Sequence, residues 1–339
     1  MTPRLLAKKD LGRFIAALAK EAEVWAPVKS TDRENCRFGP VTGAEGICLD
    51  CLQTRLPVKE LFLPQREILF RFKSDSPARV KPVSDIPARV VFGVRPCDAA
   101  ALELFDRVFL DPAGDDPYYR HRRERTALIG VACDDPGTAC FCTAVGGDPH
   151  GTAALDLLLE DIGDRWLCRP LTEKGERLAA ARGPAGKDDC AETERRAAAA
   201  REQMTFAPDL AQLAEKLAGA FDHEIWEELA RPCVNCGVCT YLCPTCHCFD
   251  VTDEERHGRG ARIRAWDSCQ FSLFTRHASG HNPRPTGTTR LRNRTLHKFR
   301  YFPHTHGPLL CVGCGRCIIH CPAGIDLRET LETLTATLR

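Results

Sequence analysis

The sequence predicts an α+β protein that has an N-terminal α/β domain, a helical connector and a cysteine-rich C-terminal domain. Two observations carry this prediction. A valine-rich segment at residues 88–94 and an apolar segment at residues 126–132 each lead into a cysteine, and a helical pattern follows the first of them. Two cysteine runs of identical spacing lie beyond residue 230. We place the boundary near residue 222, which gives domains 1–222 and 223–339, with an insertion at residues 244–310 inside the second.

Bulk properties narrow the class of protein. A chain of 339 residues is long enough for two hydrophobic cores. Its 20 cysteines fall largely in metal-ligand spacings, and no signal peptide or apolar stretch of about 18 residues is recognisable. The net charge of +1 gives no support to nucleic-acid or membrane-surface binding. We therefore expect a cytoplasmic protein without a membrane span, in a compartment that keeps thiols reduced.

The N-terminal stretch predicts one helix and leaves one cysteine group open. Residues 4–23 place Leu5, Leu6, Leu11, Phe14, Ile15 and Leu18 on one helical face. A segment rich in Gly and Pro follows, and it contains Cys36 and the pair Cys48-Leu-Asp-Cys51. This pair could begin a metal site whose partners are not evident from the sequence, or the thiols could be free in a loop.

Two βα-type units follow. The expected strand 88–94 leads into Arg95-Pro96-Cys97-Asp98 and a helix over 99–108, with Asp98 as a plausible N-cap. The expected strand 126–132 leads into Cys133. Ligands of open α/β sheets gather at the carboxyl ends of strands, so Cys97 and Cys133 should lie near one another. Cys140 and Cys142 should join them from the next loop, either as a third iron–sulfur site or as buried structural cysteines.

The chain then predicts a hairpin and a helical connector. Residues 154–170 alternate around Ile162-Gly163-Asp164, which is typical of two strands and a tight turn. Residues 171–230 are rich in Ala, Glu and Arg and predict helices. Cys168 and Cys190 in this part have no ligand spacing.

The two cysteine runs are the most specific signal in the chain. The first is Cys233-x2-Cys236-x2-Cys239-x3-Cys243-Pro244, and the second is Cys311-x2-Cys314-x2-Cys317-x3-Cys321-Pro322. This is the run of bacterial two-cluster ferredoxins, in which three thiolates hold one 4Fe–4S cluster and the fourth reaches the other cluster. The pairing is therefore predicted to be crossed: Cys233, Cys236, Cys239 and Cys321 for one cluster, and Cys311, Cys314, Cys317 and Cys243 for the other. A structural zinc site would instead use two separate C-x2-C pairs.

The insertion between the runs carries further cysteines and a basic segment. Cys246, Cys248 and Cys269 have no assigned role. The basic residues from Arg284 to Arg300 form a solvated face, face an acidic partner, or offset the negative charge of reduced clusters and their thiolates. The segment lacks the interleaved aromatic residues of single-strand nucleic-acid binders. The C-terminal domain is thus expected to be a dicluster bacterial-type ferredoxin domain with a long insertion.

Several blocks together resemble a known group of electron-transfer subunits. The blocks are FLPQREILF, FGVRPCDAAAL, CDDPGTACFC, CVNCGVCTYLCPTCHCFD, HNPRP with RLRNRTLHKF, and CVGCGRCIIHCP, spanning about residues 55–325. The chain is similar to the beta subunit of sulfhydrogenase-type nickel–iron hydrogenases and to the A subunit of anaerobic sulfite reductase. The resemblance implies a third cluster on Cys97, Cys133, Cys140 and Cys142. The Cys36–Cys51 region does not match the pattern of the family.

The resemblance implies a relay. Electrons would pass between a flavin subunit that handles NAD(P)H and a catalytic subunit, either a nickel–iron hydrogenase or a siroheme sulfite reductase. No G-x-G-x-x-G phosphate loop, free siroheme-type cysteine pairing or nucleophile with its base is recognisable, so we expect no catalytic residues. The alternatives are an enzyme that reduces a small sulfur compound at the N-terminal cluster and, less specifically, a redox sensor.

Overall fold

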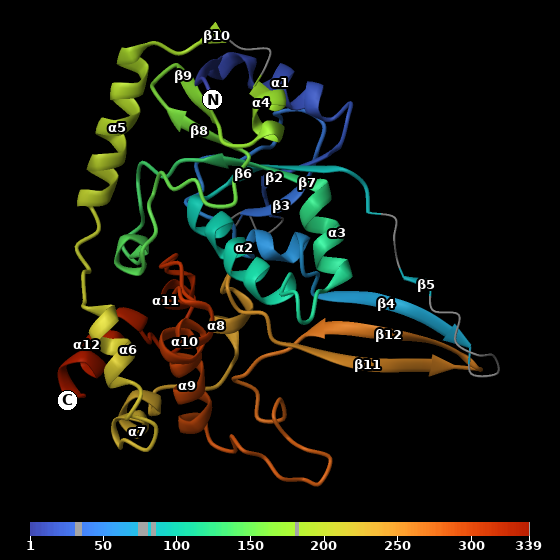
Figure 1. The fold of residues 1–339 in the computed structure, drawn as a ribbon, viewed down its shortest axis with the longest axis vertical. Helices are drawn as coiled ribbons and strands as arrows, with labels where there is room; N and C mark the ends of the chain where they lie inside the picture. Colours follow the sequence, from blue (N-terminus) through green and yellow to red (C-terminus); the bar gives the residue numbers. More distant parts are fainter. Residues whose placement is uncertain (31–35, 74–80, 83–85, 180–182, 339) are drawn as a thin grey trace. The chain divides into compact units, whose positions relative to one another are not determined.

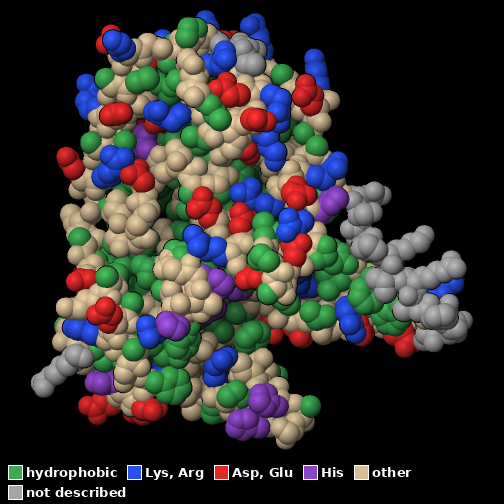
Figure 2. Space-filling model, viewed as in Figure 1, with side chains coloured by type: hydrophobic (Ala, Val, Ile, Leu, Met, Phe, Trp, Pro, Cys, Tyr) green, Lys and Arg blue, Asp and Glu red, His purple; other side chains and the backbone are tan. Residues whose placement is uncertain are grey.

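The structure is a computed structural model that describes residues 1–30, 36–73, 81–82, 86–179 and 183–338. Its contacts divide the chain into two compact units. The N-terminal unit comprises residues 1–62, 85–205 and 312–314, and the C-terminal unit comprises residues 63–84, 206–311 and 315–339. Acidic and basic side chains are interspersed on the face seen in Figure 2. Within the described ranges, no helix combines the length and the apolar character needed to cross a membrane.

The N-terminal unit is built on one mixed sheet (Figure 1). Its strands, in sheet order, are β10 (Gly183–Pro184), β1 (Arg4–Ala7), β9 (Arg165–Pro170), β8 (Leu157–Asp161), β7 (Thr126–Val131), β6 (Arg89–Val94), β2 (Glu23–Lys29) and β3 (Cys36–Val41). Strands β8, β7, β6 and β2 are mutually parallel. Every other pair of neighbouring strands in this sheet is antiparallel. The carboxyl ends of the four central strands therefore meet at one edge.

Helices cover both faces of this sheet. Helices α1 (Leu11–Leu18) and α4 (Glu173–Ala179) lie on one face, and α2 (Pro96–Phe109) and α3 (Pro117–Arg125) lie on the other (Figure 1). Phe14 and Ile15 of α1 are buried against Phe92 and Ile129 of the sheet. Burial of each such side chain stabilises the folded state by about 1.5–3 kcal/mol. The buried cluster gives this unit an apolar core of its own. The 3-10 helices η1 (Lys8–Asp10), η2 (Val58–Leu61) and η3 (Cys142–Val145) and helix α5 (Lys187–Glu202) complete it.

The structure confirms most of the expected elements of this unit and corrects two. The strands near 88–94 and 126–132, and the hairpin around residues 162–164, are present as β6, β7 and the antiparallel pair β8–β9. The expected helix over 4–23 is wrong at both ends: residues 4–7 form strand β1, which pairs with β9, and Glu23 is the first residue of β2. The apolar periodicity corresponds to an α-helix only over α1. At both ends, pairing with neighbouring strands overrides the local preference for a helix.

The second correction concerns the start of α2. Asp98 is not the N-cap, because the helix already begins at Pro96, with Arg95 in the N-cap position. Proline is favoured at the first helical position, where a backbone N–H is not needed. Asp98 therefore lies in the first turn of the helix and is buried.

The C-terminal unit combines short helices with a four-stranded antiparallel sheet. The sheet order is β11 (Phe249–Arg256), β12 (Arg259–Trp266), β4 (Arg66–Lys73) and β5 (Lys81–Pro82). The helical segments are α6 (Leu210–Lys216), α7 (Ile225–Ala230), α8 (Val238–Tyr241), α9 (Gly287–Leu296), the π-helix η4 (His297–Tyr301), α10 (Phe302–His306), α11 (Arg316–Ile319) and α12 (Leu327–Thr337). Strand β4, from early in the chain, is held to β12 by the buried ion pair of Glu67 with Arg264. This pairing was not evident from the sequence.

Candidate metal centres

The two cysteine runs fold alike. Each begins in a loop and ends in a short helix, α8 in the first run and α11 in the second. Asn235 and Gly237 have positive φ in the first run, and Gly313 and Gly315 have positive φ at the equivalent positions of the second. Left-handed residues alternating with right-handed ones turn successive backbone N–H groups toward one side of a loop. Such groups are suited to the anionic sulfurs of a cluster.

A cavity in the C-terminal unit brings together the cysteines predicted for one cluster. Cys233, Cys236, Cys239 and Cys321 all line it, and Cys317 lines it as well. Cys321 comes from the second run, so the first three thiols of one run share a cavity with the last thiol of the other. These donors fit a 4Fe–4S cluster, for which four cysteine thiolates are the usual ligands.

Two of the thiols predicted for the second cluster influence a third, Cys317, electrostatically. Burial raises the pKa of Cys317 to about 12; Arg294 opposes this rise, and the thiols of Cys243 and Cys311 add to it. The fourth predicted ligand, Cys314, belongs by its contacts to the N-terminal unit, where its carbonyl oxygen accepts a hydrogen bond from Gln53 Nε2 at 3.1 Å.

Two buried cations lie among the thiols of the C-terminal unit. Lys298 Nζ donates to Cys243 Sγ at 3.3 Å, to Thr245 Oγ1 at 2.7 Å and to the Leu310 carbonyl at 2.9 Å. Arg294 donates to the Cys239 carbonyl at 3.3 Å. Burial alone would lower the pKa of both cations, but the thiols of Cys243 and its neighbours raise the two pKa values above the ordinary range.

The burial of these cations tests whether the basic segment is a solvated face. Arg290, Arg294 and Lys298 are spaced four residues apart and are all buried, so a solvated face is wrong for these three. Uncompensated buried charges are costly, and the thiolates supply the opposite charge here. The signal in the sequence was the regular four-residue spacing of basic residues on one helical face.

The three further cysteines of the insertion each interact with another cysteine. The thiol of Cys246 interacts with Cys243, and this interaction and burial raise the pKa of Cys246. The thiol of Cys248 donates a hydrogen bond to Cys269, which lowers the pKa of Cys269 to about 6, with Gln270 and the two buried cations contributing. Cys269 is therefore the cysteine of this group that most readily becomes a thiolate.

The N-terminal unit gathers the other four predicted cysteines. Cys97, Cys133, Cys140 and Cys142 line one cavity at the carboxyl edge of the parallel strands. Burial raises the pKa of Cys133 to about 11 and that of Cys142 to about 12, and the thiol of Cys140 contributes to both shifts. Four thiols that line one cavity are suited to an iron–sulfur group, whose cationic core would stabilise their thiolate forms.

Gly93 and Arg95 shape this edge. Gly93 has a φ of +78° and forms an irregularity in the pairing of β6 with β7, and a Cβ there would lie 2.8 Å from Pro27 Cδ. The bulge redirects the chain toward Cys97. Arg95 donates to the Ala132 carbonyl at 2.8 Å, beside Cys133, and favours the thiolate form of that cysteine.

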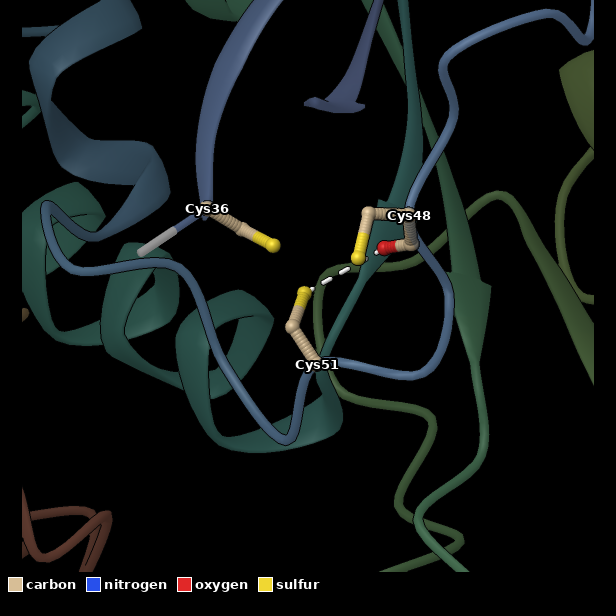
Figure 3. A group of neighbouring side chains, drawn as sticks. All are labelled: Cys36, Cys48 and Cys51. Carbon is tan, nitrogen blue, oxygen red and sulfur yellow. Dashed lines mark hydrogen bonds between the residues drawn. The ribbon is translucent and has the colours of Figure 1, made fainter. Parts of the chain in front are cut away.

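A second group of cysteines lies at the same edge and was not assembled by sequence reasoning. The Sγ atoms of Cys36, Cys48 and Cys51 all lie within 4.8 Å of one another (Figure 3). Burial raises the pKa of Cys36 and of Cys51, and neighbouring thiols of the group contribute. Only the C-x2-C spacing of Cys48 and Cys51 pointed to a site, because Cys36 joins them through strand pairing.

These features define the class of the chain: an iron–sulfur electron-transfer protein. A family model described as a 4Fe–4S dicluster domain matches residues 232–325. The sulfhydrogenase 2 subunit beta of Pyrococcus furiosus is 33% identical over 328 residues, with 94% of each chain covered. The chain therefore belongs to the family of sulfhydrogenase beta subunits, and its C-terminal half carries a domain for two 4Fe–4S clusters.

Proposed function

We propose that this chain relays electrons between a flavin subunit that handles NAD(P)H and a catalytic subunit of one oxidoreductase complex. The observation that carries the proposal is the pair of ferredoxin-type runs, whose cysteines 233, 236, 239 and 321 share a cavity. Bound 4Fe–4S clusters exchange single electrons, and a protein that holds two of them is suited to passing electrons on. The catalytic subunit is expected to be a nickel–iron hydrogenase, with a siroheme sulfite reductase as the second candidate.

The ligand sets for the two clusters follow the crossed pattern. We assign Cys233, Cys236, Cys239 and Cys321 to the first cluster and Cys311, Cys314, Cys317 and Cys243 to the second. Support comes from the shared cavity for the first set and, for the second, from the effect of Cys243 and Cys311 on the pKa of Cys317. Arg294 and Lys298 would offset part of the negative charge that each added electron brings, which favours reduction.

We further propose a third iron–sulfur cluster on Cys97, Cys133, Cys140 and Cys142. Their common cavity and the bulged, arginine-braced edge of the sheet support it. Iron analysis of the anaerobically purified chain should give about twelve iron atoms per chain with this cluster and about eight without it. Cys133→Ala should lower the count by about four, and Cys190→Ala, which changes a cysteine of helix α5 outside these sets, should leave it unchanged.

Purification under native conditions tests the relay itself. The tagged chain should be recovered in stoichiometric amounts with a flavoprotein and a metal-containing catalytic subunit. In that complex, Cys321→Ala should abolish transfer from NADPH to the catalytic subunit, while the flavin subunit still reduces an artificial dye. Turnover of hydrogen, sulfite or NADPH by the isolated chain would contradict a relay and favour an enzyme in its own right.

A further inference from the structure

Three thiols in the N-terminal unit, outside all sets assigned above, form a compact group. Cys36 is the first residue of β3, and Cys48 and Cys51 lie in the segment that follows this strand (Figure 3). Their three Sγ atoms lie within 4.8 Å of one another. In the part of the chain that the structure describes, it is the one group of three or more metal-ligating side chains this close together.

Strand pairing explains how these residues meet. Strand β3 runs antiparallel to β2, and its first residue, Cys36, pairs with Lys29 at the carboxyl end of β2. The backbone N–H of Cys48 donates to the Pro27 carbonyl at 2.8 Å, and that of Arg55 donates to the Cys36 carbonyl at 2.8 Å. Both ends of the 48–55 segment are thereby fixed to the sheet, so the thiols are positioned by backbone contacts.

Arg95 braces the same segment from the neighbouring strand. Its guanidinium donates to the carbonyls of Leu49 at 3.1 Å, Cys51 at 2.9 Å and Leu52 at 2.9 Å. This places a permanent positive charge beside the group. A divalent ion with three thiolates has a net charge of −1, and the guanidinium offsets this charge.

The spacing of the sulfurs distinguishes a single ion from a cluster. A tetrahedral zinc ion with Zn–S bonds of about 2.3 Å holds two sulfurs about 3.8 Å apart. The thiolates of a 4Fe–4S cluster bind different iron atoms, so they stand farther apart than ligands of one ion. The cysteines of the two cluster-type cavities do not form groups within the 4.8 Å limit among the described residues, whereas these three do.

We propose that Cys36, Cys48 and Cys51 bind one zinc ion, separate from the iron–sulfur sites. Thiolates select zinc, copper(I) and iron–sulfur groups among biological metals. Cys48 and Cys51 also line a small cavity together with Gln53, Thr54 and Asp98. Water or an oxygen of this cavity completes the tetrahedron, and an oxygen donor there favours zinc over copper(I). Each thiol loses its proton on binding.

X-ray absorption at the zinc edge tests the site without any variant, because it does not detect iron. The full chain is purified anaerobically, supplied with zinc and freed of excess metal. One zinc per chain with three sulfur neighbours at about 2.3 Å is expected. Copper in place of zinc, zinc bound only by oxygen and nitrogen, or no retained zinc would overturn the proposal.

Matched variants locate the ion. Cys51→Ala should lose at least nine-tenths of the bound zinc, with iron content and cluster absorption unchanged, which also shows that the chain still folds. Cys190→Ala is the control and should keep both metals. Zinc retained in Cys51→Ala, or iron lost in step with zinc, would place the metal elsewhere or show a cluster at these thiols. Failure of the zinc proposal would leave the proposed relay untouched, because the first is tested on zinc and the second on iron and electron transfer.

Discussion

The N-terminal and C-terminal units hold their thiols by different means. In the N-terminal unit a sheet with its own apolar core, covered by helices on both faces, presents cysteines at one edge. In the C-terminal unit the cysteine loops, short helices and buried cations Arg294 and Lys298 form much of the interior around the candidate cluster. We therefore expect the first unit to fold before its metals bind and the second to depend more strongly on metal, which would neutralise the thiolates of its interior.

Removal of iron should produce the largest difference between the units. Without metal, the thiols and buried cations of the C-terminal unit lose their common partner, so this unit should unfold first. Limited proteolysis of chelator-treated chain should cleave within residues 230–325 and leave residues 1–62 and 85–205 resistant. Protection of 230–325 in the metal-free chain would contradict the comparison.

Loss of one cluster at a time should sharpen the comparison between the two units. Cys239→Ala and Cys133→Ala should each remove about four iron atoms per chain. Only Cys239→Ala should also make its unit sensitive to protease, since Cys133 lies beside a sheet with its own core. Equal protease sensitivity of the two variants would show that both units depend on metal to the same degree.

The edge of the N-terminal sheet should show a pH dependence that needs no metal. His150 is buried between Asp134 at 2.7 Å and Glu160 at 3.2 Å. Burial disfavours its charge, but these carboxylates raise its pKa from 6.5 to about 9. A raised pKa stabilises the folded state fully below about pH 6.5 and loses this effect as pH rises through about 9.

The expected size is at most about 3 kcal/mol in the free energy of unfolding. Urea unfolding of the full chain, followed by tryptophan fluorescence, should give a lower midpoint at pH 9.5 than at pH 6. His150→Asn should be less stable at pH 6 and should flatten this dependence. A midpoint for the unaltered chain that does not fall over this range would refute the role given to His150.

The smallest expected effect concerns a cluster potential in the C-terminal unit. Lys298→Met keeps the length of the side chain but removes the cation that donates to Cys243 Sγ. Reduction adds negative charge, so loss of a nearby cation should lower the potential, by on the order of 60 mV, tenfold in a one-electron equilibrium. Redox titration followed by paramagnetic resonance measures the shift. Lys298→Arg retains the charge and should move the potential less; an unchanged potential in Lys298→Met would exclude the cation as a determinant.

The sequence by itself determined the features that depend on neighbours along the chain. The runs at 233–244 and 311–322 predict ferredoxin-type cluster binding because each contains its ligands within one short loop. The βα pattern around Cys97 and Cys133 predicted where these two residues lie, since parallel strands end at a common edge. The dicluster domain and the family agree with these expectations.

The tertiary structure alone decided the contacts between distant segments. Cys36 joins Cys48 and Cys51 because β3 pairs with β2, and β1 replaces an expected helix because it pairs with β9. Arg294 and Lys298 are buried among cysteine sulfurs, although a run of basic residues more often faces solvent. Strand pairing and charge compensation depend on which segments meet in space, and spacing along the chain does not encode this.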